Sequence, residues 1–265
     1  MSRAWCRGIV STNPELSESL IKDYGIPVRL IHNIPRGVPE PSGPGGPPRS
    51  GRVPVVGAAG PLIAASGYPV FLNAARKVVD SGIDAEFLIA GEGDDEAELR
   101  RRAERLRIAD RLTFADDLTV GLTFWDALDV FCQTSVAPTT GRSLDLAMAH
   151  GVPSVASDVE GLRGRIRDGA TGIQVPAGDS TALARAIAGL LSDTDRAGRI
   201  GEAGRMSISS DHHPDNEADR LLALYQQVVA RGCEPIEVLS DHEIELGMSR
   251  PGGLARSAPG VVADS

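Results

Sequence analysis

Short runs of consecutive apolar residues alternate with longer segments of helical periodicity along most of the 265-residue chain. Six of these runs lie at 53–59, 85–90, 111–114, 129–133, 153–157 and 172–176. The runs are continuous instead of alternating between apolar and polar residues, which is typical of strands that are buried on both faces of a parallel sheet. We therefore predict an α/β fold with a doubly wound parallel sheet and right-handed crossover connections.

The segments between the runs carry the signals of helices. Residues 94–108 place Leu99, Ala103 and Leu106 on one face, with acidic residues at the start and arginines in the later turns. This distribution suits both an amphipathic helix and its dipole. Asp179 has the side chain of an N-cap and predicts a helix that begins immediately after it.

Composition divides the chain into five parts. Residues 39–52 are dominated by proline and glycine and are interpreted as a linker. The linker separates a short unit at 1–38 from the main domain at 53–210. A C-terminal helix is expected at 211–232, and the composition of 233–265 predicts a disordered tail.

The two flanking parts have their own patterns. The first is interpreted as strand, helix and strand, with strands at 8–11 and 28–31 and a helix that starts near Pro14. The C-terminal helix carries an apolar stripe that includes Leu222 and Tyr225, which predicts a buried face.

The charge balance narrows the classes of partner. The chain has 27 basic and 36 acidic residues, so its formal charge is 27 − 36 = −9. Such a chain is not expected to bind nucleic acid or anionic membranes non-specifically. It contains no apolar run near the ~20 residues of a membrane-spanning helix, and its first residues lack the apolar core of a signal peptide. We therefore expect a cytoplasmic protein without a transmembrane segment.

Cysteine and histidine spacing gives no sign of a metal centre. Cys6, Cys132 and Cys233 are odd in number and far apart, so neither a disulfide framework nor a zinc site is predicted. The five histidines share no ligand spacing. We expect no metal and no cofactor.

Ligands of open α/β sheets bind at the carboxyl ends of the strands, so the loops after the apolar runs are candidate binding segments. The candidate residues for binding a nucleotide-sugar are Gly60, Gly91, Gly141, Arg142, Ser143 and Leu144. Glycine lets the backbone approach a ligand closely, and a helix that begins near Ser143 would direct N–H groups at a phosphate. The chain has neither the Gly-x-Gly-x-x-Gly spacing nor a Walker motif.

Several segments occur in a recognisable order: GAAGPLIAASGY, FLIAGEGDDEAEL, AMAHGVPSVASDVEGL and DGATGIQVPAGD. In sequence, spacing and order they resemble the nucleotide-sugar-binding half of the family 4 retaining glycosyltransferases (glycosyl transferases group 1). The resemblance implies the Rossmann-like C-terminal domain of the GT-B architecture. It also implies an NDP-sugar donor for hexose transfer to a glycan or lipid acceptor. Residues 1–38 resemble the end of the N-terminal half, most of which is missing, so a separate acceptor-binding chain is expected.

The chain departs from the family pattern at its working positions. The family places an Arg and a Lys on the donor diphosphate, whereas the matching positions here are Pro61 and Ser66. Two glutamates of the family correspond to Pro138 and Leu146, neither of which can accept a hydrogen bond through its side chain. Asp145 is interpreted as an early-helix acid on a solvated face. No catalytic residue is assigned.

Two interpretations therefore remain open. In the first, the chain binds an NDP-sugar, with backbone N–H groups from 141–144 and the charge of Arg142 replacing the missing cations. In the second, it is a non-catalytic relic or binding module with a degenerate active site.

Overall fold

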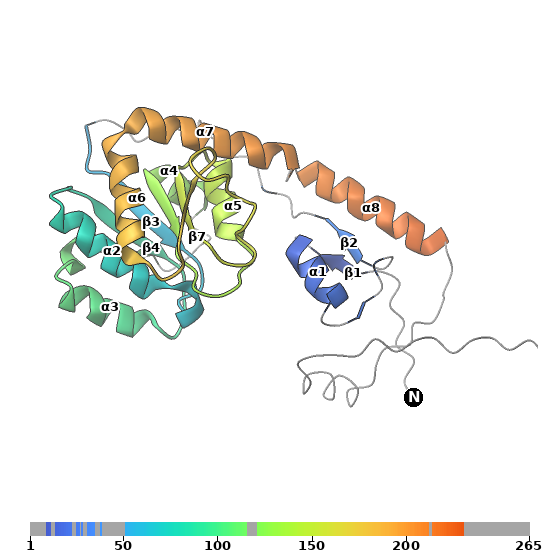
Figure 1. Ribbon diagram of the computed structural model, residues 1–265, viewed down its shortest axis with the longest axis horizontal. Helices are drawn as coiled ribbons and strands as arrows, with labels where there is room; N and C mark the ends of the chain where they lie inside the picture. Colours follow the sequence, from blue (N-terminus) through green and yellow to red (C-terminus); the bar gives the residue numbers. More distant parts are fainter. Residues whose placement is uncertain are drawn as a thin grey trace, which may run out of the picture.

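The computed structural model describes residues 9–11, 14–22, 25–26, 28, 31–34, 38, 51–115, 121–211 and 214–230. Most of the expected linker and the expected tail lie outside these residues, as do Cys6 and Cys233. Figure 1 shows a layered α/β domain and a small unit made of β1, α1 and β2.

The domain is built on one parallel sheet. Its strands are β3 (Val55–Ala59), β4 (Glu86–Ala90), β5 (Leu112–Ala115), β6 (Val130–Gln133), β7 (Ser154–Ser157) and β8 (Ile173–Val175). All six predicted runs form strands, and each strand pairs with its neighbours in parallel. The spatial order is β5-β4-β3-β6-β7-β8, so strand order reverses between β3 and β6. The doubly wound, Rossmann-like prediction is confirmed.

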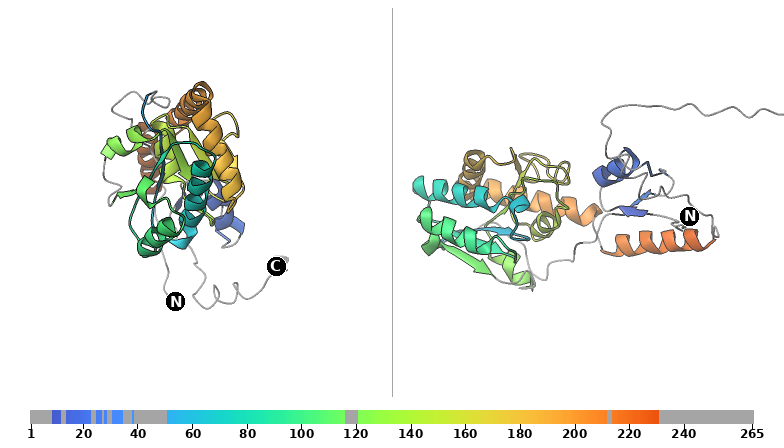
Figure 2. Two further views of the ribbon diagram at one scale, coloured as in Figure 1. Left: turned by 90° about the vertical axis from the view of Figure 1, so that its left-hand side faces the viewer. Right: turned by 90° about the horizontal axis from the view of Figure 1, so that it is seen from below.

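Six helices complete the described part of this domain: α2 (Tyr68–Asp80), α3 (Glu96–Arg105), α4 (Gly121–Ala127), α5 (Arg142–Ala149), α6 (Ser180–Ser192) and α7 (Thr194–Asp211). Short 3₁₀ turns are η2 (Ala64–Ser66) and η3 (Ala109–Arg111). Helices α2, α3 and α6 cover one face of the sheet, and α4 and α5 cover the other (Figures 1 and 2).

Two apolar layers hold the helices to the sheet. The first apolar layer includes Phe71, Leu72, Leu99 and Ile187. The second apolar layer includes Phe124, Trp125, Leu144 and Met148.

Strand β6 shows how the two layers share one strand. Val130 and Cys132 belong to the first layer, whereas Phe131 between them belongs to the second. Successive side chains of a strand point to opposite faces, so a continuous apolar run supplies both layers.

A buried carboxylate lies at the amino ends of the two central strands. The Asp129 side chain accepts hydrogen bonds from the Val55 N–H at 2.7 Å and from Arg52 Nη2 at 3.1 Å. The Asp129 N–H in turn donates to the Val55 carbonyl at 2.8 Å. The chain that leaves the linker is therefore fastened to the start of β3 and to the segment that enters β6.

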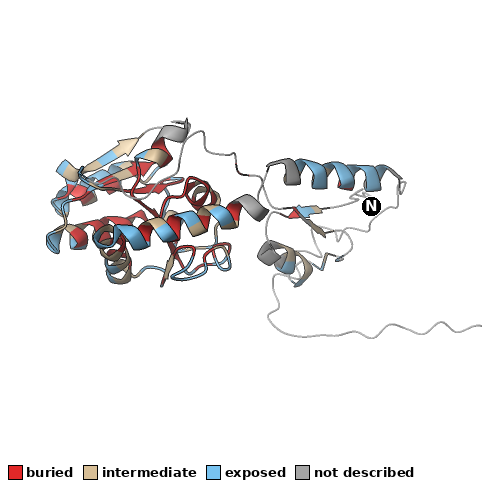
Figure 3. Ribbon diagram, turned by 90° about the horizontal axis from the view of Figure 1, so that it is seen from above, coloured by how far each residue is buried: buried red, intermediate tan, exposed pale blue. Residues whose placement is uncertain are grey.

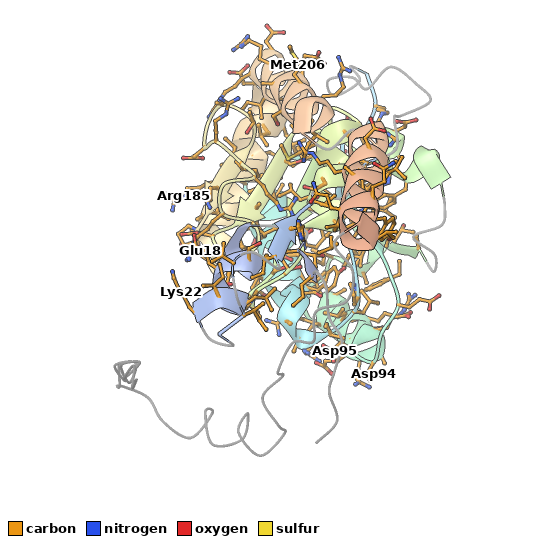
Figure 4. All side chains as sticks on the ribbon, turned by 90° about the vertical axis from the view of Figure 1, so that its right-hand side faces the viewer. Glu18, Lys22, Asp94, Asp95, Arg185 and Met206 are labelled. Atoms are coloured by element: carbon orange, nitrogen blue, oxygen red, sulfur yellow. The ribbon has the colours of Figure 1, made fainter. Side chains whose placement is uncertain are left out.

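The small unit contains β1 (Ile9–Ser11), α1 (Pro14–Lys22) and β2 (Ile31–Asn33). β1 and β2 pair in parallel, and Glu18 and Lys22 form an ion pair on α1 at 2.9 Å (Figure 4). The second strand was expected at 28–31 but begins at Ile31. The Ile26 N–H still donates to the Leu20 carbonyl at 3.0 Å, so the chain after α1 folds back on the helix before it enters the sheet.

Helix α8 (Pro214–Ala230) extends from the end of α7 away from the sheet (Figure 1). The buried stripe predicted for this helix is wrong, because Leu222 and Val229 are 56% and 77% exposed. Figure 3 shows the same contrast between α8 and the buried strands. The hydrophobic periodicity of the sequence predicts that the helix has an apolar face, but it does not predict what covers that face.

The predicted cap of α6 is confirmed. The Asp179 carboxylate accepts the N–H groups of Ala182 at 2.9 Å and Thr181 at 2.8 Å. These hydrogen bonds, led by that from Ala182, lower the pKa of Asp179. A lowered folded-state pKa means that the stabilisation is present above the unfolded pKa of about 3.9 and is lost as the pH falls through the folded value.

We expect Asp179→Ala to lower the melting temperature at pH 7 and Asp179→Asn to retain most of the cap, because an amide oxygen also accepts the two N–H groups. The difference in stability between wild type and Asp179→Asn should shrink as the pH is lowered below about 4. Thermal unfolding from pH 7 to pH 2 measures this, with Asp94→Asn at an exposed acid as the control. A constant difference across this range would contradict the assigned role.

Candidate functional site at the strand ends

The loops that follow β3 and β6 are hydrogen-bonded to each other where strand order reverses. Thr134 Oγ1 donates to the Ser66 carbonyl at 2.9 Å, and the Val136 N–H donates to the Ala65 carbonyl at 2.9 Å. Such a reversal is where doubly wound sheets bind their ligands. These two hydrogen bonds therefore fix the position of the loop after β3 relative to the loop after β6.

The loops after β3 and β4 are also in close contact. The Gly60 N–H donates to the Ala90 carbonyl at 2.9 Å, and the Tyr68 hydroxyl donates to the Gly60 carbonyl at 2.8 Å. Burial raises the pKa of Tyr68, so its hydroxyl remains a donor. A Cβ atom on Gly91 would lie 2.0 Å from the Gly60 carbonyl oxygen. Gly91, which is predicted to bind the ligand, thus also has a packing reason to be glycine, whereas Gly60, with the same prediction, is favoured as glycine by its φ of +144°.

A third junction joins the loop before α5 to the turn after β7. The Thr139 N–H donates to the Glu160 carbonyl at 3.1 Å. A Cβ atom on Gly161 would lie 1.7 Å from the Thr139 carbonyl oxygen, and Gly161 has φ +86°. The two backbones approach so closely that only glycine fits at this position.

A buried ion pair crosses the same junction. The side chains of Arg165 and Asp145 are 13% and 5% exposed, and Arg165 Nη1 donates to both carboxylate oxygens of Asp145. The remaining Arg165 donors reach carbonyls, with Nε 2.8 Å from Gly161 and Nη2 2.9 Å from Thr140. The interpretation of Asp145 as a solvated acid is wrong, because its side chain is buried and paired with Arg165. The two residues are 20 positions apart in the sequence, so no local sequence pattern predicts the pair.

The structure places the predicted binding residues along the same edge of the sheet. Gly141 is the N-cap of α5, and Arg142 and Ser143 are partly buried in its first turn. The Leu144 side chain is fully buried in the second apolar layer, so only its backbone N–H can face a ligand. The first N–H groups of an α-helix have no partner within the helix and, together with the helix dipole, favour an anion. Contact with a nucleotide-sugar remains a prediction.

The four departures from the family pattern differ in their surroundings. Pro61 and Pro138 are exposed, and Ser66 is partly exposed with its hydroxyl donating to the Pro61 carbonyl at 2.6 Å. Leu146 is partly buried and packs against the second apolar layer. A charged side chain could therefore be accommodated at the first three positions but would disturb packing at the fourth.

Titratable groups near the sheet are explained by packing. The His150 ring is buried, with Nδ1 3.1 Å from Asp126 Oδ1. Burial raises the pKa of the Cys132 thiol, which is typical of an unreactive core cysteine.

Among the described residues, no three His, Cys, Asp or Glu side chains gather as metal ligands. None of the helices in that part of the chain has the length and apolar character needed to cross a membrane.

The junction at Gly161 can be tested against a nearby glycine. Gly161 and Gly164 both have positive φ, but an added Cβ atom clashes with backbone only at Gly161. Both alanine variants should lose about 1–2 kcal/mol from the strained φ. Gly161→Ala should lose roughly a further 1–3 kcal/mol, because the Thr139 backbone must move. Urea unfolding measures both values, and equal losses would contradict the close approach.

Comparisons with known proteins agree with this architecture. The phosphatidyl-myo-inositol mannosyltransferase of Mycobacterium leprae (strain TN) is 32% identical over 169 residues, which cover 63% of this chain and 45% of that protein. The chain thus spans about half the length of this relative.

Two solved structures share the fold. The glycosyltransferase of Rickettsia africae ESF-5 matches with a TM-score of 0.75 and 18% identity, over 85% of this chain and 64% of that chain. Anabaena Alr3699/HepE in complex with UDP-glucose matches with a TM-score of 0.74 and 20% identity, over 83% of this chain and 64% of that chain.

A family model described as glycosyl transferases group 1 matches residues 53–193, which is more than half of the 265-residue chain. The matched region contains the whole six-stranded sheet and the loops at its carboxyl edge. The chain therefore belongs to the glycosyl transferases group 1 family.

Proposed function

We propose that the chain binds a nucleoside diphosphate-sugar at the carboxyl ends of β3 and β6. Backbone N–H groups from 141–144 and the guanidinium of Arg142 are the candidate contacts for the diphosphate. Residues 53–210 form the donor-binding domain. The sugar is then transferred as a hexose, with retention, to a glycan or lipid acceptor bound by a separate chain. The protein carries out this reaction in the cytoplasm.

One observation carries this proposal: the N-terminus of α5 and the reversal of strand order lie along the same edge of the sheet. The loop that leads into α5 begins at Thr134, beside the reversal, and ends at Gly141. An anionic ligand there meets the N–H groups of the first helical turn and the positive end of the helix dipole. The mannosyltransferase relative and the UDP-glucose complex support a sugar nucleotide as the ligand class.

The second candidate function is a non-catalytic binding module. It is favoured by Pro61 and Ser66, which stand where the family pattern has the Arg and Lys of the diphosphate clamp. A hydrogen bond to a charged group is worth about 1.5–3 kcal/mol, so loss of two such contacts would weaken donor binding strongly. The two functions differ in whether the chain as it stands binds a donor.

Thermal unfolding with UDP-glucose, GDP-mannose and ADP-glucose at millimolar concentration separates the two functions. A donor present at tenfold its dissociation constant adds about 1.4 kcal/mol of stability, which should raise the melting temperature by about 3–6 °C. Free glucose and mannose, which lack the diphosphate, should give no shift. The absence of a shift with all three donors would contradict donor binding for this panel.

A restored clamp tests the module interpretation directly. In Pro61→Arg with Ser66→Lys, both new cations replace side chains that are at least partly exposed, so the fold should tolerate them. If the clamp alone has been lost, this variant should gain a donor-dependent shift that wild type lacks, since each charge-assisted contact contributes about 1.5–3 kcal/mol. The uncharged pair Pro61→Gln with Ser66→Gln is the matched control. If no donor raises the melting temperature of either variant, loss of the two cations does not explain the absence of donor binding.

A further inference from the structure

We propose that Arg165 is a positioning residue that holds the segment 139–144 in the conformation needed to present its backbone N–H groups at the strand ends. The consequence for donor affinity rests on the proposed function. Arg165 lies in the connection between β7 and β8, and it belongs to none of the sequence motifs that predicted the site.

The guanidinium of Arg165 joins two backbone carbonyls and one side-chain carboxylate. Nε donates to the Gly161 carbonyl at 2.8 Å, Nη2 donates to the Thr140 carbonyl at 2.9 Å, and Nη1 donates to Asp145 in the first turn of α5. Thr140 and Asp145 lie on either side of the N-cap, Gly141. One rigid side chain therefore fixes the residue before the cap and a residue after it.

The packing around this side chain leaves little freedom. A Cβ atom on Gly141 would lie 2.9 Å from Arg165 Nε, so the cap residue rests directly on the guanidinium. A lysine has one point of charge instead of a planar fork and cannot span the two carbonyls and the carboxylate at once. The role depends on the shape of arginine, and charge alone does not supply it.

The ion pair also argues against Arg165 as a direct phosphate ligand. Nε, Nη1 and Nη2 all donate within the protein, and the charge is balanced by Asp145. The side chain is 13% exposed. Arg163, two residues earlier, is a contrast because it is 60% exposed and pairs with the exposed Asp158 at 2.7 Å.

The test compares Arg165→Lys with the matched control Arg163→Lys. Both variants keep the net charge, and Arg165→Lys keeps a cation beside Asp145. Three quantities are measured on the full chain: the melting temperature, amide hydrogen exchange over 139–145 without ligand, and dissociation constants for UDP-glucose and GDP-mannose. The Thr139 and Asp145 N–H groups, which lie in this segment and are hydrogen-bonded, report the exchange. Arg165→Lys should accelerate exchange in this segment by about tenfold or more and weaken nucleotide binding by roughly ten- to a hundredfold. Arg163→Lys should change neither.

A second variant separates loop position from global stability. Replacing a buried ion pair by apolar residues is often nearly neutral for stability, so Arg165→Met with Asp145→Leu should melt close to wild type. It still removes the donors to Thr140 and Gly161, so it should show the same faster exchange and weaker binding as Arg165→Lys. Normal exchange in this double variant would overturn the proposal.

The outcomes keep the two proposals apart. If wild type binds neither nucleotide, the proposed function fails for those donors, and hydrogen exchange alone decides the positioning role. If wild type binds but Arg165→Lys matches Arg163→Lys in exchange and affinity, the positioning role is overturned and the proposed function stands. Faster exchange with unchanged affinity would likewise overturn the connection between Arg165 and the site.

Discussion

A parallel sheet covered on both faces confines polar chemistry to the ends of its strands, and the rest of this structure follows from that constraint. Val130 and Cys132 supply one apolar layer and Phe131 the other, so the interior of β6 has no room for a functional group. The groups able to meet a ligand are therefore in the loops. Family membership and architecture agree because both depend on the same alternation of buried strands and helices.

Close backbone contacts help to hold the strand-end loops together. At Gly91 and Gly161 a carbonyl oxygen of a neighbouring loop occupies the place of a Cβ atom. Gly91, which is expected to admit a ligand, thus also admits a neighbouring loop. These packing roles can persist after the donor contacts have been lost, because they need no polar side chain at Pro61 or Pro138. A preserved loop framework is consequently compatible with both proposed functions.

The sequence predicted what depends on local pattern. Buried strands, the α3 stripe and the Asp179 cap are confirmed, because each is encoded within a few neighbouring residues. The sequence does not reveal the burial of Asp145 or the exposure of Leu222, because both depend on distant parts of the chain. The same limit applies to the candidate site. Motif positions identify which loops matter, but the junction through Arg165 required the fold.

The carboxylate of Asp129 lies at the opposite edge of the sheet from these loops. It ties Arg52 and the start of β3 to the segment that enters β6. The two central strands are therefore anchored at the point where the polypeptide enters the domain. A pulling force on the chain before Gly51 would therefore reach the sheet at the amino ends of β3 and β6, the end opposite to the candidate site.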